Sequence, residues 1–544
     1  AHGRAVGTIS THGLTLAPGN NTITMSGKLK PATRQGLDAL SAFMSTYLQQ
    51  KSQKTTVRGI DAGESTVIWL QKVVDGIELS TAFPGAMKDF QIMTDIRLVS
   101  MNMIFSNKSG PPMVGAIVQA NLGMPPQCDM SIVKDVTKAG MSFDMVYEGD
   151  VAGGLNLTKE APVDYQNGQI TVAFQLTPMT IREDKMHVMQ SLIKDLLTHP
   201  SKVVQMRGTS APQVVSNAGT LQLVDIPFQG ETTMYGFNNF LSPRTQSPLM
   251  SIDKIDVVGG EAGILHLAVD FQITNPSNVA PSMGQVTMEL WATSGFKIGD
   301  VTVDDFSLTA NQHRNSTTKF TSVPARYISP TASADAAHAG RLFLSTFVSH
   351  GAQEAQVRGT AAGTGFALLQ PAMEAFRTSS HVPGLAEKIC LKAVMHIPSA
   401  FRISNVPVDM TTYNPFGTPM TITGVHCEIH ACEEFQSPSV CKKFYNDSVG
   451  VYTPDKFNVV VAPRTQVTLP RHNAELHEVL SLQVIAALFK SIGDGSLIYI
   501  SGTMDIEVGG FQMQIDFSER DIPICLQYLF HSCSTFSESS AAFV

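Results

Sequence analysis

The residues with the clearest potential for chemistry lie in one short stretch from His426 to Cys432, which reads H-C-E-I-H-A-C. Imidazole nitrogen and cysteine sulfur are the usual protein ligands of zinc, so a metal site is the first hypothesis for this stretch. If the stretch is a strand, its side chains alternate, and His426 and His430 stand about 13 Å apart on one face. One metal with ligand bonds of about 2.1 Å cannot join them. We therefore predict no metal site, with Cys427 packed inward and Cys432 bonded to Cys441 across a hairpin loop.

The cysteines and glycosylation sequons bear on the cellular compartment. Six of the seven cysteines lie in the last third of the chain, and their spacing matches no zinc or C-x-x-C redox motif. Each of the five N-x-S/T sequons falls in a predicted turn or near a predicted strand end. Together they favour the cell exterior or the lumen of the secretory pathway, with N-linked glycans on the surface. The alternative is a reduced protein whose cysteines are buried apolar residues. The disulfide candidates are Cys390, Cys427, Cys432, Cys441, Cys525 and Cys533, and the glycosylation candidates are Asn20, Asn107, Asn156, Asn315 and Asn446.

Sequence signatures of catalysis are absent. The chain has no nucleophile elbow, P-loop, H-E-x-x-H pair or dinucleotide fingerprint, and Gly363-Thr364-Gly365 lacks the preceding strand and third glycine of a phosphate-binding loop. We therefore predict a protein that is not an enzyme and holds no cofactor. Methionine, present 25 times, fills irregular cores or lines adaptable pockets. A lipid therefore stays a candidate partner beside the simpler role of methionine in the core.

Composition indicates a folded chain with few charges. Of 544 residues, 43% are hydrophobic and only 15% are charged, against roughly 25% charged in typical soluble proteins. A surface with so few charges suits a protein that contacts neighbouring molecules. The net charge of −8 comes without any basic run, which argues against nucleic acid as a partner. The sequence has no stretch of about eighteen apolar residues, so we predict no membrane-spanning helix.

Two sequence signals recur along the chain with nearly the same period. The first is a run of apolar residues at helical spacing, followed by a short strand that ends in glycine, at Gly59, Gly208, Gly359 and Gly502. These glycines are 149, 151 and 143 residues apart (208−59, 359−208 and 502−359). The predicted helices before them lie at 37–48, 186–197, 342–348 and 476–488.

The second signal is a glycine followed by apolar residues two, seven and nine positions later. It occurs at Gly7, Gly299 and Gly450, and in a copy one residue shorter at Gly149. The intervals are 142, 150 and 151 residues (149−7, 299−149 and 450−299). Two unrelated patterns that keep step along a chain indicate a true repeat.

Period-two alternation fills the segments between these signals, most clearly from Leu265 to Ile273, and the turn Asn275-Pro276-Ser277 follows. Many short alternating strands with Gly, Pro and Asn turns are typical of an antiparallel β-sandwich. We predict a mainly β fold with helices (α+β), made of tandem immunoglobulin-like sandwiches. Each would be followed by a helix, a returning strand and a second short helix, as at 66–74. The predicted divisions are a partial first unit at 1–88, a second at 89–245, a third at 246–388, a Cys-containing fourth at 389–525 and a tail at 526–544.

The order strand, Asn-Pro turn, strand, glycine, strand resembles the sandwich of the late-embryogenesis-abundant group-2 family, also called the water-stress and hypersensitive-response domain. Asn275-Pro276-Ser277 and Ile298-Gly299 match the turn and the later glycine of that family. The fuller unit resembles a domain of unknown function in fungal and oomycete secretory and vacuolar-lumen proteins, through Leu122 to Pro125, Leu14 to Asn20 and the helix with its Val-Arg-Gly strand. This resemblance implies a lumenal or extracellular, non-catalytic domain that binds lipid or assembles. The loop from Cys432 to Cys441 and the tail after Cys525 depart from it.

The start of the chain shapes the functional hypothesis. The sequence opens at Ala1 with neither Met nor an apolar signal segment, as in a mature form or a fragment. Residues 5–29 carry only the closing strands of a sandwich, which would leave apolar side chains and an unpaired strand edge uncovered. Either upstream residues cover them, or another subunit donates strands, for which 504–508 and 511–517 are the candidates. The predicted assembly interface comprises Ile9, Leu14, Leu16, Ile23, Met25, Phe511, Met513 and Ile515.

We therefore predict an extracellular structural protein whose main partner is itself. Copies that join head to tail through unlike patches do not close, so they would form a glycosylated filament by strand complementation between subunits. The alternative hypothesis is a lumenal array that binds lipid or protein within a membrane-anchored secretory or vacuolar protein. A contiguous apolar groove of about 300 Å³ or more would favour the alternative.

Overall fold

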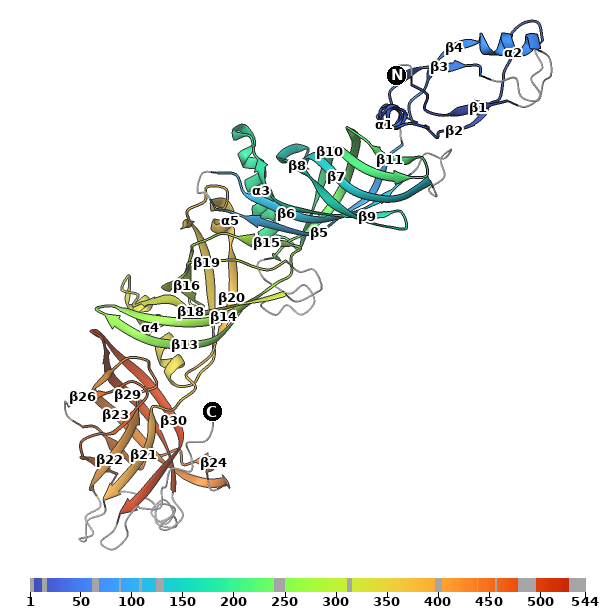
Figure 1. The fold of residues 1–544 in the computed structure, drawn as a ribbon. Helices are drawn as coiled ribbons and strands as arrows, with labels where there is room; N and C mark the ends of the chain where they lie inside the picture. Colours follow the sequence, from blue (N-terminus) through green and yellow to red (C-terminus); the bar gives the residue numbers. More distant parts are fainter. Residues whose placement is uncertain are drawn as a thin grey trace.

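The computed structural model has a mainly β fold, in which groups of strands and helices follow one another in chain order along an elongated molecule (Figure 1). We name these groups by the predicted divisions: the first unit (1–88), second unit (89–245), third unit (246–388) and fourth unit (389–525). The structure describes residues 4–11, 17–60, 68–87, 90–106, 110–123, 132–238, 250–310, 316–396, 404–437, 439–454, 457–477 and 496–527.

The first unit has two small sheets and two helices. Antiparallel pairs are formed by β1 (Thr8–Ser10) with β2 (Ser26–Lys28), and by β3 (Gln53–Arg58) with β4 (Glu78–Phe83). α1 (Arg34–Leu48) begins after Thr33, whose hydroxyl accepts a hydrogen bond from Gly36 N at 3.1 Å, and α2 (Ile68–Asp75) precedes β4. These helices confirm the two that were predicted in this unit. The apolar side of α1 packs against the second unit, with Leu40, Phe43 and Leu48 in one cluster with Leu221, Leu223 and Ile226.

The second unit is a nine-stranded sheet that includes one strand of the third unit. Its strand order is β11-β10-β7-β8-β9-β6-β5-β15, with β12 also paired to β10. β15 (Val279–Ser282) belongs to the third unit and pairs in parallel with β5, so the two units share this sheet. The elements of the second unit are β5 (Met93–Ile104), β6 (Met113–Leu122), β7 (Val133–Tyr147), β8 (Asp150–Gln166), β9 (Gln169–Thr180), a 3₁₀ turn (Glu183–Lys185), α3 (Met186–Thr198), β10 (Ser201–Ser216), β11 (Gly219–Gln222) and β12 (Ile226–Tyr235).

The third unit is a seven-stranded sheet with the order β13-β14-β18-β17-β16-β19-β20. The predicted turn after β14 is held by Asn275, whose side-chain amide donates to Val279 O at 2.9 Å and whose Oδ1 accepts from Ser277 N at 2.8 Å. The elements are β13 (Met250–Glu261), β14 (Ile264–Asn275), β16 (Val286–Ala292), β17 (Lys297–Val303), β18 (Ser316–Ile328), α4 (Ala334–Val348), β19 (Gln353–Thr364), α5 (Gln370–Ala375) and β20 (Arg377–Val382).

The fourth unit is a ten-stranded sheet that closes on itself in a barrel-like way, because β21 pairs with both β22 and β30. The helix predicted at 476–488 lies outside the described residues from position 478 onward. β30 continues to Gln527 and so enters the predicted tail. The strands are β21 (Cys390–His396), β22 (Asn405–Tyr413), β23 (Met420–Ser437), β24 (Val440–Phe444), β25 (Gly450–Tyr452), β26 (Val459–Val461), β27 (Gln466–Thr468), β28 (His472–Leu476), β29 (Ser496–Val508) and β30 (Phe511–Gln527).

The four units alternate between two types. The order α1-β3-α2-β4 of the first unit recurs as α4-β19-α5-β20 in the third, and Gly59 and Gly359 are 300 residues apart (359−59). The contact with the following unit recurs too. Ser45 of α1 accepts a hydrogen bond from Val224 N at 3.1 Å, and Ser345 of α4 accepts one from Asp516 N at 2.8 Å. The first and second units therefore form a pair that the third and fourth units repeat.

This alternation corrects the prediction that every unit contains a second short helix. Only the first and third units show one among the described residues, as α2 and α5. In the second unit β11 follows β10 instead, and in the fourth unit the strands β29 and β30 are joined at Gly509 and Gly510, both with positive φ. The glycines of the first signal are required for the same reason in both types of unit. A Cβ on Gly59, Gly208, Gly359 or Gly502 would lie 1.8–2.2 Å from a backbone carbonyl oxygen, so no side chain fits there.

The second signal was misassigned in one copy. Gly149 has a φ of +88° and lies in the tight turn between β7 and β8. The glycine of the second unit that matches Gly299 is Gly153, which pairs with Met145 of β7 as Gly299 pairs with Leu290 of β16. Spacing alone did not separate a turn glycine from a glycine packed inside a sheet.

Candidate functional site

The His-Cys-Glu-His stretch lies on β23 with the predicted alternation, since Cys427 and its neighbours on that face are buried while His426 and Glu428 are exposed. Its two histidines have separate partners. His426 Nδ1 lies 2.9 Å from Thr453 Oγ1, and His430 Nδ1 lies 3.2 Å from Tyr445 O. Among the residues that the structure describes, no three His, Cys, Asp or Glu side chains gather as metal ligands. The stretch is part of a sheet and its histidines bind the adjoining strand and loop.

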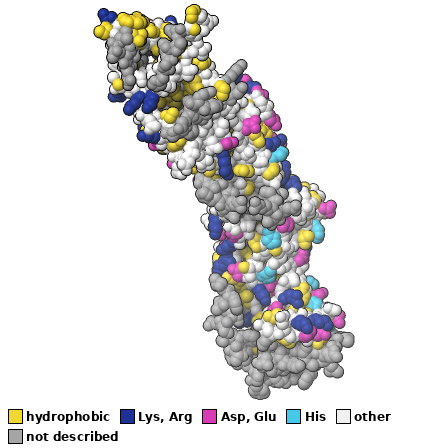
Figure 2. Space-filling view, turned by 90° about the vertical axis from the view of Figure 1, so that its right-hand side faces the viewer, with side chains coloured by type: hydrophobic (Ala, Val, Ile, Leu, Met, Phe, Trp, Pro, Cys, Tyr) yellow, Lys and Arg dark blue, Asp and Glu magenta, His cyan; other side chains and the backbone are white. Residues whose placement is uncertain are grey.

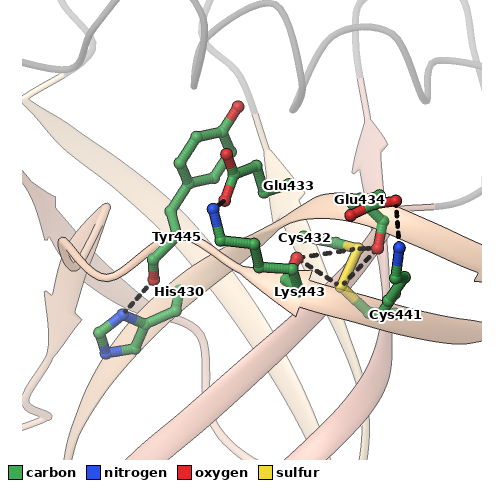
Figure 3. Close-up of polar contacts among 8 residues, drawn as sticks. His430, Cys432, Glu433, Glu434, Cys441, Lys443 and Tyr445 are labelled. Carbon is green, nitrogen blue, oxygen red and sulfur yellow. Dashed lines mark hydrogen bonds and ion pairs between the residues drawn. A yellow bond between two sulfur atoms is a disulfide. The ribbon is translucent and has the colours of Figure 1, made fainter.

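Cys432 and Cys441 form the predicted disulfide, which joins β23 to β24 (Figure 3). Two ion pairs flank it, one between Lys443 and Glu433 at 2.6 Å and one between Lys442 and Glu434 at 2.7 Å. Cys441 N donates to Asp521 Oδ1 at 2.8 Å, which ties the hairpin to β30. The disulfide is compatible with an oxidising compartment. Within the described part of the chain, no helix is long and apolar enough to cross a bilayer.

Cys390 and Cys427 are free thiols, which corrects their inclusion among the disulfide candidates. Both are buried in the fourth-unit core, where they act as small apolar residues. Burial raises the pKa of Cys427 to about 12 and raises the pKa of Cys390 well above its usual value, so neither is a ready nucleophile. Cys525 is disulfide-bonded, and Cys533 lies outside the described residues.

An apolar cavity lies between α3 of the second unit and α5 of the third. Its volume is about 80 Å³, and it is partly open to solvent. Beside it, the buried Asn278 joins the two units, because its amide donates to Leu98 O at 3.0 Å and its Oδ1 accepts from Tyr235 N at 2.8 Å. Methionine contributes strongly to the cavity wall, through Met103, Met189, Met234, Met283, Met288 and Met373.

The sequon asparagines that the structure describes are exposed, namely Asn20, Asn156 and Asn446, whereas Asn107 and Asn315 lie outside the described residues. Asn156 was predicted in a turn or near a strand end, which is wrong. It lies inside the 17-residue strand β8, opposite Ser142 of β7. Asn446 lies in the turn after β24.

The first unit exposes an apolar face whose counterpart in the third unit is buried. Gly59 N donates to Ile77 O at 3.0 Å, as Gly359 N donates to Phe376 O at 3.1 Å, and this shared contact aligns the two segments. Trp69, Val73 and Ile77 of the first unit are 66%, 52% and 39% exposed. Their counterparts Leu368, Ala372 and Phe376 are 7%, 3% and 5% exposed.

The same difference continues onto β4. Leu79 and Phe83 are 51% and 39% exposed, whereas Thr378 and Val382 at the matching positions of β20 are 5% and 3% exposed. We call Trp69, Val73, Ile77, Leu79 and Phe83 the first-unit face. Apolar side chains gather at the upper end of the space-filling view, which is the first unit (Figure 2).

Three elements cover the counterpart of the first-unit face in the third unit, and the described part of the first unit has no equivalent of them. There α5 packs against α3 of the second unit, β20 packs against β13, and β19 pairs with β16. In the first unit, among the described strands, β3 pairs only with β4 and β1 pairs only with β2. Sequence reasoning recognised the uncovered strands near residues 5–29 but did not predict that α2 and β4 carry an exposed apolar face. The signal available was the near-300-residue match between the first and third units.

The structure divides the predicted assembly residues into two groups. Ile9, Ile23 and Met25 are exposed, and Leu14 and Leu16 lie outside the described residues. Phe511 and Ile515 are buried and Met513 is half-buried, because β29 and β30 pair with each other and form the inner face of the fourth unit. The prediction that these strands are free to be donated is therefore wrong. The end of β30 even pairs in parallel with β21, much as β15 pairs with β5.

One buried ion pair joins the third unit to the fourth. Glu519 of β30 is buried, and its Oε2 lies 3.1 Å from His350 Nε2 just after α4. Its other oxygen accepts from Ile389 N at 2.9 Å. The hydrogen bond to Glu519 raises the pKa of His350, against a smaller opposing effect of burial. The pair therefore couples the joint between these units to pH.

Comparison with known proteins finds a family of unknown function (DUF3712) at residues 155–290. No curated protein matches the sequence. Among solved structures, the chain is similar to red sea bream transglutaminase, with 9% identity and a TM-score of 0.22, over 79% of this chain and 55% of that one. It thus spans about half the length of the transglutaminase. It is also similar to a putative membrane anchored protein from Corynebacterium diphtheriae, with 8% identity and a TM-score of 0.14, over 87% of this chain and 95% of that one.

Proposed function

We propose that this chain is a non-enzymatic structural repeat protein whose copies assemble head to tail through the first unit. The observation that carries the proposal is the first-unit face, which is exposed although its counterpart in the third unit is buried. Exposed apolar patches rimmed by polar residues mark interaction sites in soluble proteins. The third unit buries the counterpart of the first-unit face against other parts of the same chain. The elements that cover this counterpart therefore indicate what kind of element covers the first-unit face.

The free energy gained by burying the first-unit face is large enough to contribute to a stable complex. Fully burying one large apolar side chain is worth roughly 1.5–3 kcal/mol, and the five residues of the face are on average about half exposed. Covering them is therefore worth roughly 4–7 kcal/mol. Association itself costs about 4–15 kcal/mol in lost freedom of motion, so the face needs further contacts to give a stable complex. Strand pairing at the edges of β1 and β3 that no described strand occupies is a source of these contacts.

The alternation of unit types suggests which part of a second copy docks there. Inside the chain, the counterpart of the first-unit face docks on the second unit, through α5 and α3. The fourth unit is of the same type as the second, so the fourth unit of a neighbouring copy is the matching partner. Such a contact joins unlike patches and extends without closing, which gives a filament.

Three finer features belong to the same proposal. The units are tandem sandwiches of the immunoglobulin-like kind resembling the late-embryogenesis-abundant group-2 domain, and the DUF3712 match at 155–290 supports one domain of unknown function in this chain. The protein works outside the cell or in the secretory lumen, as the Cys432–Cys441 disulfide favours. Its filament carries N-linked glycans, for which Asn20, Asn156 and Asn446 are accessible.

The cavity between α3 and α5 is the basis of a second candidate function. Its wall is almost entirely apolar, and its open side is compatible with entry of an apolar ligand. Under this alternative the chain is a lumenal array that binds lipid at the junction between its second and third units. A fluorescent fatty acid that binds the purified chain, and that is displaced when Ala372→Trp fills the cavity, would support it.

Sedimentation of the purified chain, followed by electron microscopy, tests the assembly proposal. We expect species larger than the monomer that grow with concentration and form linear arrays with the repeat length of one chain. A monomer at all concentrations up to about 100 μM would refute head-to-tail assembly, because a specific contact of moderate strength has a Kd in the micromolar range or below.

A further inference from the structure

Two strand pairs in the chain are parallel, and both hold the first strand of a unit. β15 runs parallel to β5 with Val279 opposite Met101, and the end of β30 runs parallel to β21 with Ile524 opposite Ala393. β5 and β21 are the first strands of the second and fourth units. Their parallel partners follow later in the chain, β15 within the third unit and β30 as the last described strand of the fourth. The same device therefore occurs in both units of this type.

β5 runs along the molecule from the first unit toward the third. Just before β5, Phe90 and Ile92 pack in the cluster around α1, and just after it the ring of Phe105 lies 5.9 Å from that of Phe366 in the third unit. The units follow one another along the elongated molecule (Figure 1). A pull on the two ends of the molecule therefore draws the start of β5 toward the first unit and draws the third unit away from it.

β15 moves with the third unit, because hydrogen bonds fix it there. Leu308 N donates to Pro281 O at 3.0 Å, and Met283 N donates to Phe306 O at 2.8 Å. From Met283 the chain continues into β16 of the third-unit sheet. Under a pull on the molecule, β15 is drawn toward its own end while β5 is drawn toward its own start.

The backbone bonds between β5 and β15 resist this sliding together. Met101 N donates to Asn278 O and Phe105 N donates to Ser282 O, both at 2.8 Å, so the ladder spans the full length of β15. When two strands are pulled along their shared axis, all bonds between them stretch at once and must break in one step. When strands are peeled from one end, the bonds break one after another. The pair is therefore strongest in the direction of the long axis.

We propose that the chain bears tension along its long axis, and that the parallel pairs β5–β15 and β21–β30 carry the load. The fourth unit has the same geometry. β21 starts beside the third unit, where Ile389 N donates to Glu519, and its other end has His396 opposite Gln527. A pull on the third unit and on the chain beyond Gln527 slides β21 and β30 past each other. This inference goes beyond the assembly proposal, since it concerns a single chain.

Single-molecule pulling in two directions is the direct test. Thr94, Ser106 and Gln285 are exposed, so double-cysteine variants of the full chain can hold DNA handles in optical tweezers. Handles on Thr94→Cys and Gln285→Cys load β5 and β15 along their axis. Handles on Ser106→Cys and Gln285→Cys peel the same pair from one end. The parent without added cysteines measures handle attachment to native thiols.

We expect the joint to break at least about tenfold more slowly at the same force when the load runs along the strands. The reason is that each further bond that must break in the same step slows rupture about fivefold. Equal rates in the two directions refute the role of this pair in carrying the load.

A substitution in β15 tests whether the ladder itself carries the load. In a parallel ladder the N–H of Ala280 points toward β5, between the two bonds described, and that of position 281 points away. Ala280→Pro should therefore speed rupture along the strands about fivefold, whereas Pro281→Ala should change it less than about twofold. Ala280→Pro should leave the peeling rate within about twofold, because peeling starts at the other end of the pair. Equal acceleration in both directions indicates a damaged joint and contradicts shared loading.

The fourth unit allows the same comparison. Handles on Glu387→Cys and Gln527→Cys load β21 and β30 along their axis, and handles on Asn405→Cys and Gln527→Cys peel them from the end at His396. We again expect rupture to be at least about tenfold slower along the strands. Equal rates at both pairs refute a chain built for tension. Because single molecules are pulled at high dilution, this result does not depend on whether copies assemble.

Discussion

A matched pair of substitutions tests whether the first-unit face is open in the free chain. Val73 on α2 and Ala372 on α5 occupy equivalent positions, and they are 52% and 3% exposed. We consider Val73→Asp and Ala372→Asp, which introduce the same charge at the same place in two copies of one structural element. The substitutions differ in one respect, which is whether another element covers the position.

The structure sets the expected magnitudes. At position 73 the carboxylate stays in water, so the free energy of unfolding should fall by less than about 1 kcal/mol, the usual limit for a surface change of this kind. At position 372 the carboxylate would lie against α3 in the apolar cavity, where no described basic group lines the wall. Leaving a charge buried and unpaired costs about 3–5 kcal/mol. The difference between the two variants should therefore be at least about 2 kcal/mol.

Chemical denaturation followed by circular dichroism measures both losses, and sedimentation of the same samples measures assembly. Val73→Asp should leave stability near that of the parent and abolish assembly, because it places a charge in the contact. Lys72→Asp is the control, since Lys72 is exposed on the same helix outside the face. The reasoning is refuted if Val73→Asp destabilises the free chain as much as Ala372→Asp, because the face would then be covered within one chain. It is equally refuted if Val73→Asp assembles like the parent.

Two further predictions concern the joints between units, and a third concerns the β23–β24 hairpin of the fourth unit. Because the pKa of His350 is raised, its protonated form stabilises the fold fully below the ordinary pKa of about 6.5, and this stabilisation is lost as pH rises through the raised pKa. The melting temperature should therefore fall over that pH range. His350→Gln should make this fall smaller. Ser45→Ala and Ser345→Ala each remove the matching hydrogen bond between a side chain and the backbone of the next unit. Each should lower the free energy of unfolding, measured by denaturation, by about 1–2 kcal/mol. A large loss at only one of the two sites would contradict the repeat of the paired units. Replacing both Cys432 and Cys441 by Ser should lower the free energy of unfolding by about 2–3 kcal/mol, from the loop entropy for a separation of 9 residues. An unchanged free energy of unfolding would show that the other contacts of the hairpin are enough to hold it.

The sequence predicted the parts of the fold that depend on local patterns. The apolar residues from 37 to 48 form α1, the alternation around Cys427 matches its buried side in β23, and the Cys432–Cys441 pairing is present. Each of these follows from contacts within or next to one element. The glycine signal is of the same kind, because its cause is the approach of a neighbouring backbone to Gly59, Gly208, Gly359 and Gly502.

The parts that could not be predicted depend on which element covers which. Gly149 and Gly153 are both glycines near the start of β8, and only the pairing with Met145 of β7 shows that Gly153 is the repeat position. The alternating apolar residues of β30 read equally well as a donated strand or as the inner wall of a closed unit. The parallel pairing of its end with β21 decides for the wall. A local sequence pattern predicts that a strand has an apolar side, but the tertiary structure determines what that side packs against.

The position of the family match shows how neighbouring units of the chain complete one another. The match begins at residue 155, two residues after Gly153 in β8, and ends at residue 290 inside β16, the central strand of the third unit. A module with these limits contributes flanking strands to one sheet and the central strand to the next. Each such module is thus completed by a strand from its predecessor, as β16 enters between β17 and β19.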